Sequence, residues 1–228
     1  MKKTLPALKN EIVEVGRRVY ERGYVASNDG NISARLDERR VVITPTGVSK
    51  GFMHARDLLV VDMDGRVISG RGTPSSETRL HLRIYKERPD VRSVCHAHPP
   101  YATGFAVAGI PLDQPLLPEV VITLGSIPLV PYETPGTEEF CLPMLPFLQG
   151  YDAFLLANHG ALAVGTTVLG AYHRMETMEH AAQIAFVALQ LGKTTPLTPD
   201  QVRKLVDQRS RYGIRTSIGG MTGNGDAE

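Results

Sequence analysis

Histidines in two short motifs are the residues whose types and spacing most clearly suggest chemistry. His96 and His98 end the run VRSVCHAH (91–98), which is rich in residues that favour β-strands. Because alternate residues of a strand point to the same face, both imidazoles can bind one metal ion. His159 follows the apolar run FLLA, and the adjacent Gly160 permits a sharp turn. Three imidazoles leave a coordination position open, as catalytic zinc sites require, although HAH also suits a polar strand end and His159 a hydrogen-bonded turn.

A glutamate at an expected helix start adds a carboxylate to these ligands. Glu77 follows Ser75 and Ser76, and a helical pattern continues from there until Pro89 stops it. Backbone N–H groups and hydroxyls at a helix N-terminus form a favourable anion site, which suits a phosphate group. Glu77 would then lie beside that phosphate, or it is simply an acidic residue that caps the helix.

The remaining sequence supplies the helices and strands that must position these residues. Helices are expected at 5–22, from 75 to before 89, at 101–109, at 136–149 with internal prolines, at 167–191 and from 198 onward. Strands are expected within 27–35, at 41–47, 58–62, 66–69, 91–98 and 127–132, early in 152–160, and at 161–165. Because hairpins do not occur in a purely parallel sheet, the pattern predicts an α/β fold, a three-layer α/β/α domain around a central mixed, mostly antiparallel sheet. This single domain would span 1–218, followed by a flexible, glycine-rich tail at 219–228.

Composition and charge argue against several classes of protein. Of the 228 residues, 42% are hydrophobic and 21% are charged, so the chain can bury a core and is not disordered throughout. The 25 Lys and Arg and 24 Asp and Glu give a net charge of +1, which argues against nucleic acid or a membrane surface as partner. No apolar run reaches the roughly 18 residues of a membrane span, and Cys95 and Cys141 form neither a CxxC motif nor a disulfide framework. These features predict a soluble, cytoplasmic protein.

Six short motifs follow one another over nearly the whole chain. They are GNIS (30–33), ITPTG (43–47), PSSE (74–77), HAHPPYA (96–102), ANHG (157–160) and RYGIR (211–215). In this order they resemble the class II aldolase/adducin family, and most of all its aldolases that act on L-fuculose 1-phosphate. The resemblance implies cleavage of a ketose 1-phosphate into dihydroxyacetone phosphate and an aldehyde. It also implies a homotetramer whose active sites lie at subunit boundaries.

The resemblance gives each matching residue a role. His96, His98 and His159 match the ligands of Zn²⁺, and Mn²⁺, Co²⁺ or Fe²⁺ also bind such nitrogen ligands. The Lewis acidity of the metal would stabilise an enediolate, and Glu77 matches the acid/base that moves a proton to and from the enediolate carbon. Tyr212 matches a C-terminal tyrosine near the active site. The positions that match the substrate-phosphate site are Asn31, Gly47, Ser75 and Ser76, with Thr46 close by and Asn28 where the aldolase has a threonine.

One segment departs from the family pattern. The aldolases have a tyrosine near 114–126 that donates a proton toward the aldehyde, whereas no tyrosine lies between Tyr101 and Tyr132 in this chain. Glu119 is the nearest ionisable residue, and it is either a replacement acid/base or an ordinary loop carboxylate. Relatives also catalyse pentulose-phosphate epimerisation, dehydration and decarboxylation, and adducin-like members are non-catalytic binding modules. The complete HAH, NHG and SSE motifs favour an enzyme, with aldol cleavage as the leading expectation.

The other histidine patterns are weaker. His81 lies four residues after Glu77, so both can share a helix face, where His81 either packs beside the site or takes part in metal binding or proton transfer. His173, Glu176 and His180 share one face of the longest helix, but the Glu-x-x-His pairs and partner glutamates of di-iron bundles are missing. We therefore expect a solvated or subunit-contact face there.

Overall fold

The computed structural model describes residues 3–137 and 139–209. Its helices are α1 (Leu5–Glu21), α2 (Thr78–Glu87), α3 (Pro100–Ala108), α4 (Pro118–Thr123), α5 (Val168–Gln190), α6 (Pro199–Arg209) and the 3₁₀ helix η1 (Glu139–Met144). Its strands are β1 (Asn31–Arg35), β2 (Arg40–Ile43), β3 (Leu59–Asp62), β4 (Val67–Ser69), β5 (Ser93–Ala97), β6 (Leu129–Val130), β7 (Ala153–Leu156) and β8 (Gly160–Gly165). Within these residues, none of the helices combines the length and hydrophobicity needed to cross a membrane.

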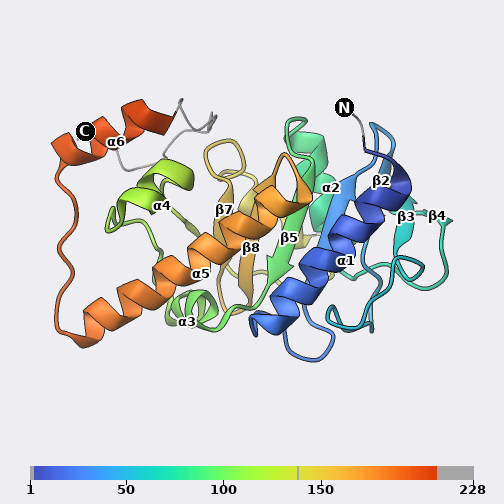
Figure 1. Ribbon diagram of the computed structural model, residues 1–228, viewed down its shortest axis with the longest axis horizontal. Coiled ribbons are helices and arrows are strands. Elements are labelled where there is room, and N and C mark those ends of the chain that lie inside the picture. The colour runs from blue at the N-terminus through green and yellow to red at the C-terminus, as the bar shows by residue number, and fades with distance from the viewer. Residues whose placement is uncertain (1–2, 138, 210–228) are drawn as a thin grey trace.

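The eight strands form one mixed sheet. Their order is β4-β3-β2-β1-β5-β8-β7-β6, and every neighbouring pair is antiparallel except β6 and β7 (Figure 1). The expected mixed, mostly antiparallel sheet is therefore confirmed. The central strands β1 and β5 join the two halves of the sheet, and β5 leads into the HAH motif.

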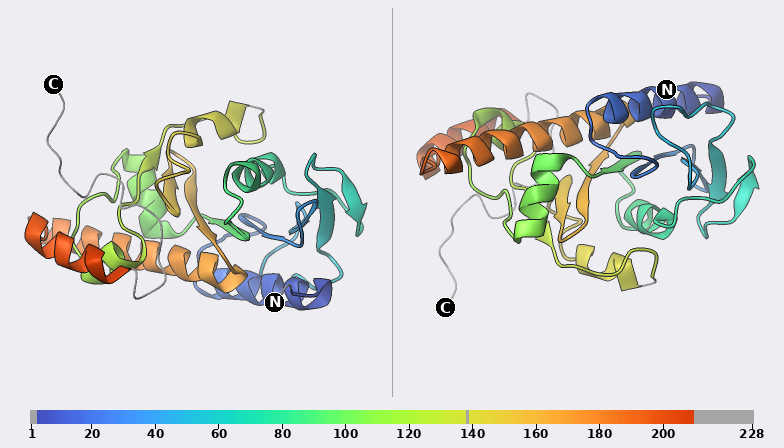
Figure 2. Two further views of the ribbon diagram at one scale, coloured as in Figure 1. Left: turned by 90° about the horizontal axis from the view of Figure 1, so that it is seen from above. Right: turned by 90° about the horizontal axis from the view of Figure 1, so that it is seen from below.

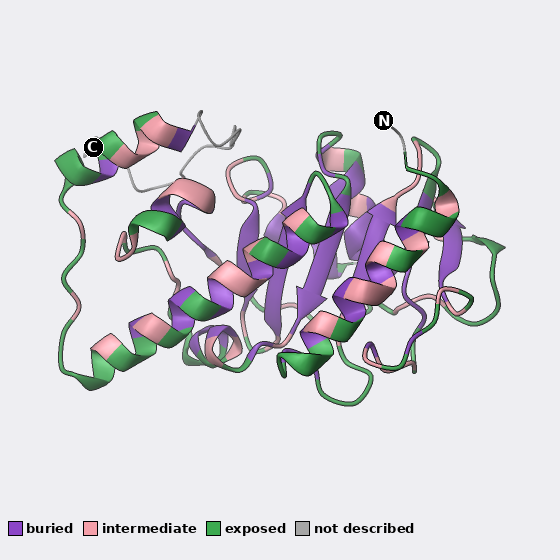
Figure 3. Ribbon diagram, in the orientation of Figure 1, coloured by how far each residue is buried: buried purple, intermediate pink, exposed green. Residues whose placement is uncertain are grey.

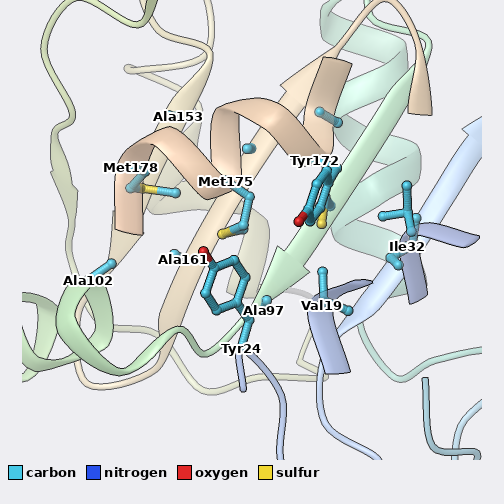
Figure 4. Packing of buried hydrophobic residues seen from close by; sticks show 14 of the residues in the cluster. Val19, Tyr24, Ile32, Ala97, Ala102, Ala153, Ala161, Tyr172, Met175 and Met178 are labelled. Atoms are coloured by element: carbon cyan, nitrogen blue, oxygen red, sulfur yellow. The ribbon is translucent and has the colours of Figure 1, made fainter. Parts of the chain in front are cut away.

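Helices cover both faces of this sheet, as expected for three layers. The helices α1, α3 and α5 pack on one face, and α2 and η1 pack on the other (Figure 2). Alternate residues of β2 show the division, since Val42 packs with the first group of helices and Val41 with the second. The strands are mostly buried except for the edge strand β4, whose three residues are exposed (Figure 3). Figure 4 shows Tyr172 and Met175 of α5 packing near Val19 of α1.

The ends of the helices follow from capping residues that the sequence displays. Thr4 caps α1 by accepting a hydrogen bond from the N–H of Ala7 at 3.4 Å. Before α6, the N–H of Thr198 donates to the side chain of Gln201 at 2.8 Å, and the N–H of Gln201 donates back to the Thr198 hydroxyl at 3.4 Å. This reciprocal capping box is the one expected from the sequence.

Several elements differ from the sequence-based expectation. The segment expected as a helix at 136–149 contains only the 3₁₀ helix η1, because Pro143 has no N–H to continue an α-helix. The strand expected at 127–132 shortens to Leu129–Val130. The helix expected from Ser75 begins at Thr78, and the short helix α4 was not expected.

A buried carboxylate connects the two helical layers through the edge of the sheet. Asp152, just before β7, is 3% exposed. Its oxygens lie 3.0 Å from an Arg88 nitrogen at the end of α2 and 2.8 Å from an Arg174 nitrogen on α5. Removal of one partner from such a buried pair leaves a charge that water no longer solvates.

We predict that Asp152→Ala lowers the free energy of unfolding by about 1–3 kcal/mol, because the buried Arg88 loses this hydrogen-bonded counter-charge and keeps its pair with Asp90 at 2.7 Å. Asp64→Ala is the matched control, since the side chain of Asp64 is 67% exposed and lies 3.9 Å from Lys86. The control should change stability by at most about 1 kcal/mol. Urea unfolding of both variants measures the difference, and equal stabilities would contradict a role for this network.

Candidate metal centre and active site

His96 is held rigidly in the centre of the sheet. On β5 it lies opposite Asn31 of β1 and Leu162 of β8, and its side chain lies on the α2 side together with that of Val94. Its Nδ1 is 2.9 Å from the carbonyl oxygen of Ala161. A hydrogen on Nδ1 donates to that oxygen, so the neutral ring presents a lone pair at Nε2.

His98 and His159 converge on the same point. His98 follows the last residue of β5, and its Nε2 is 3.2 Å from the Nε2 of His96. His159 lies between β7 and β8, with its ring centroid 4.7 Å from that of His96 and 5.2 Å from that of His98. One ligand atom from each of the three residues lies within 4.8 Å of the others. In the described part of the chain, no other group of three such side chains converges in this way.

The turn that presents His159 depends on two neighbouring residues. Asn158 adopts the left-handed conformation, with φ of 55°, which asparagine tolerates better than most residues. The sharp turn expected at Gly160 is therefore made by Asn158 instead. Gly160 supplies space, because a Cβ there would lie 2.6 Å from His98 Cδ2 and 2.7 Å from the Ala97 carbonyl oxygen.

Glu77 faces the three histidines. It occupies the N-cap position of α2, and its side chain makes no capping hydrogen bond there. Its Oε2 is 3.3 Å from His96 Nε2, and its Oε1 is 3.6 Å from His159 Nε2. Burial alone would raise the pKa of Glu77, but attraction to His96 and a hydrogen bond with His159 outweigh it and lower the pKa to about 2. The residue is a carboxylate at neutral pH.

The donor set fits a divalent metal ion. Burial lowers the pKa of His96 to about 3 and also lowers the pKa of His98, so both rings are neutral at pH 7. The Nδ1 of His98 lies 3.6 Å from an Asp29 oxygen, which favours a hydrogen on that nitrogen and a lone pair on Nε2. Two facing lone pairs repel unless a cation lies between them. Tetrahedral ligands of zinc are separated by roughly 3.4 Å, close to the 3.2 Å between these nitrogens.

The structure brings most of the expected phosphate-binding positions together. Asn31 of β1 lies opposite His96 of β5 in the sheet. Two backbone hydrogen bonds join the segments 44–46 and 73–75. The N–H of Thr46 donates to the carbonyl oxygen of Thr73 at 3.0 Å, and the N–H of Ser75 donates to that of Thr44 at 3.3 Å. Thr46, Gly47 and Ser76 are exposed beside this junction. Asn28 is exposed in the turn before β1.

The helix N-terminus contributes less to this region than the sequence suggested. The N–H of Glu77 donates to the Ser75 hydroxyl at 3.3 Å, and the N–H of Thr78 donates to the Ser75 carbonyl at 3.0 Å. These two N–H groups are already used within the turn. The hydroxyls, the amide of Asn31 and the open loop at Gly47 are thus the principal groups left for an anion.

Other expected residues lie elsewhere. Glu119 is exposed in the first turn of α4, and among the described residues no hydrogen bond or ion pair joins its carboxylate to the histidines. Tyr212 lies outside the described residues. His81 is buried with Nδ1 2.7 Å from the Ser33 hydroxyl, and burial lowers its pKa to about 4, as expected for packing beside the site. On α5, Glu176 pairs with Arg22 at 2.7 Å.

One supporting residue was not identified from the sequence. Glu179 of α5 is buried, and its carboxylate accepts hydrogen bonds from the N–H groups of Tyr101 at 3.0 Å and Ala102 at 2.8 Å. These are the first free N–H groups of α3, which begins two residues after His98. These two hydrogen bonds fix the backbone that follows His98. No short sequence motif on α5 indicates this role of Glu179.

Comparison with known proteins agrees with this geometry. Residues 10–186 match the model for the class II aldolase and adducin N-terminal domain. This chain belongs to the class II aldolase/adducin family. It is similar to 3-oxo-tetronate 4-phosphate decarboxylase of Haemophilus influenzae, with 36% identity over 87% of this chain and 96% of the relative. It is also similar to L-fuculose phosphate aldolase of Methanococcus vannielii, with 35% identity over 80% of this chain and 98% of the relative.

A solved structure shares the arrangement of helices and strands. The crystal structure of YgbL from Klebsiella pneumoniae superposes with a TM-score of 0.83 and 33% identity, covering 89% of this chain and 99% of that chain. The chain is thus a metal-dependent enzyme of the class II aldolase superfamily, whose relatives divide between aldolases and decarboxylases of phosphorylated substrates.

We predict that Gly160→Ala weakens Zn²⁺ binding by about tenfold or more, because the added methyl group displaces the His98 ring from its ligand position. Competition with a chromophoric chelator measures the dissociation constant. Gly104→Ala on α3 is the matched control, since a Cβ there meets no atom within 4 Å. Equal affinity in both variants would show that the space at Gly160 is not needed for the metal site.

Proposed function

We propose that this enzyme breaks a carbon–carbon bond of a phosphorylated sugar acid or sugar and leaves an enediolate that Glu77 protonates. The observation that carries the proposal is the buried Glu77 carboxylate, which lies 3.3 Å from His96 Nε2 and 3.6 Å from His159 Nε2. A carboxylate in that place can exchange a proton with a substrate held at the histidines.

The two reactions named for the relatives have a common product in chemical terms. Loss of CO₂ from 3-oxo-tetronate 4-phosphate breaks the C1–C2 bond and leaves the electron pair on C2, delocalised onto the C3 carbonyl. Protonation at C2 then gives dihydroxyacetone phosphate. Aldol cleavage of L-fuculose 1-phosphate leaves the same enediolate and an aldehyde. One site can therefore support either reaction, depending on which group leaves.

The residues of this chain supply the proton transfer. A divalent metal ion held by His96, His98 and His159 would supply Lewis acidity toward negative charge on the substrate oxygens. The ionised Glu77 accepts the proton of the C2 hydroxyl and returns it to C2 after CO₂ has left, and one proton from water replaces it on the oxygen. Burial of Glu77 keeps this proton from exchanging freely during the step.

Decarboxylation is the reaction that the described site favours. It requires one acid/base, and Glu77 is the carboxylate that faces the histidines. Aldol cleavage also requires a second group to accept the proton of the hydroxyl on the departing aldehyde, and the exposed Glu119 makes no contact with the histidines within the described residues. Aldol cleavage is the second candidate because an aldolase with 35% identity is among the relatives. In that case Glu119 and Tyr212 would act across a subunit boundary in a homotetramer.

Product analysis distinguishes the two reactions. With Zn²⁺-loaded enzyme in D₂O, we expect 3-oxo-tetronate 4-phosphate to give equal amounts of CO₂ and dihydroxyacetone phosphate that carries one deuterium at the protonated carbon. Mass spectrometry and NMR measure both products. Formation of an aldehyde from L-fuculose 1-phosphate, without CO₂ from the acid, would select aldol cleavage instead.

We predict that Glu77→Gln retains the metal but lowers kcat by about 10²–10⁴-fold, because the amide cannot accept and return a proton. Glu87→Gln, on the same helix but paired with Arg83 at 2.8 Å, is the matched control and should keep normal turnover. Steady-state kinetics and metal analysis test both variants. Normal turnover in Glu77→Gln would remove Glu77 from the mechanism.

A further inference from the structure

Lys50 is an unusually buried cation beside the expected phosphate-binding loops. It is 2% exposed, and lysine is rarely buried to this extent without a partner. Its burial depends on close packing of α1, because a Cβ at Gly16 would lie 2.9 Å from the Lys50 carbonyl oxygen. The glycine therefore allows the helix to cover the segment that carries this lysine.

The ammonium group of Lys50 joins two segments that are far apart in the sequence. Its Nζ donates to the carbonyl oxygen of Asn28 at 2.9 Å and to that of Val48 at 2.8 Å. Asn28 lies in the turn that leads to Asn31, and Val48 follows directly after Gly47. The side chain thus fixes the distance between the loop before β1 and the loop after β2.

The charge of Lys50 has no ion pair in the described part of the chain. No carboxylate of those residues lies within 4.0 Å of its Nζ, although Asp29 acts on it at longer range. Burial lowers the pKa of Lys50 to about 8, so most molecules carry the charge at pH 7. A buried charge is costly unless an opposite charge compensates it, and an anion bound between the two loops would do so.

We infer that Lys50 is a positioning residue for the substrate phosphate: it holds the Asn28 and Val48 loops at the spacing that receives the phosphate and supplies the positive potential there. The inference rests on the proposed phosphorylated substrate. Within the described residues, both hydrogen bonds of the Lys50 ammonium group go to main-chain oxygens, so the residue acts through the loops and its charge.

The test uses Co²⁺-loaded protein, whose visible spectrum reports ligands that reach the metal. Dihydroxyacetone phosphate and dihydroxyacetone are titrated into wild type and Lys50→Met, which keeps the length of the side chain but loses the charge. We expect Lys50→Met to bind dihydroxyacetone phosphate about tenfold or more weakly, with unchanged affinity for dihydroxyacetone and unchanged metal content. Lys9→Met is the matched control, because Lys9 also donates to a main-chain oxygen, that of Leu58 at 2.8 Å, and should bind both ligands normally.

Two outcomes would overturn the inference. Undiminished affinity of Lys50→Met for dihydroxyacetone phosphate would make the lysine a purely structural residue, and so would an equal loss for both ligands. If Lys50→Met does not fold, Lys50→Gln replaces it, because its amide still donates to a carbonyl without carrying a charge. Wild-type protein that binds both ligands equally would instead refute the phosphorylated substrate of the proposed function, and the inference with it.

Discussion

The close approach of three imidazole nitrogens is the constraint on which the rest of the site depends. One nitrogen each from His96, His98 and His159 lies within 4.8 Å of the other two, and a cation among them relieves the repulsion between the facing Nε2 lone pairs of His96 and His98. The hydrogen bond from His96 to Ala161, the missing side chain at Gly160 and the left-handed Asn158 all serve this arrangement. Each restricts the rings before any metal binds, which lowers the entropy lost on binding.

The antiparallel pairing of the strands places the other polar groups of the site around these rings. Because β5 pairs with β1 on one side and β8 on the other, the end of β5 meets Asn31 and the turn that carries His159. The α2 layer covers the same face of the sheet and brings Glu77 to the histidines. The loops proposed to bind the phosphate lie near Asn31 and are joined by main-chain hydrogen bonds and by Lys50. The proposed acid/base Glu77 and the proposed phosphate-binding loops thus lie at the same end of the central strands β1 and β5.

The sequence predicted the site where its chemistry is encoded in short motifs. HAH, NHG and SSE identified the histidine cluster and Glu77, and runs of β-favouring or apolar residues predicted the strands that lead to the histidines. Features that depend on residues far apart in the sequence could not be predicted, since nothing near Glu179 indicates that it binds the start of α3. The helix α4 was missed for another reason, because it is too short to show a helical pattern. The role of Gly160 was misassigned because only the folded chain shows which atoms a side chain there would meet.

His96, His98 and His159 should together bind one divalent ion beside Glu77. Anomalous diffraction from crystals grown with Zn²⁺, recorded on both sides of the zinc absorption edge, locates such an ion. We expect a single strong peak bound by the Nε2 atoms of all three histidines, with the Glu77 carboxylate facing it. A fully loaded crystal whose zinc lies elsewhere, or in which one of the three rings is turned away from the ion, would disprove this metal site.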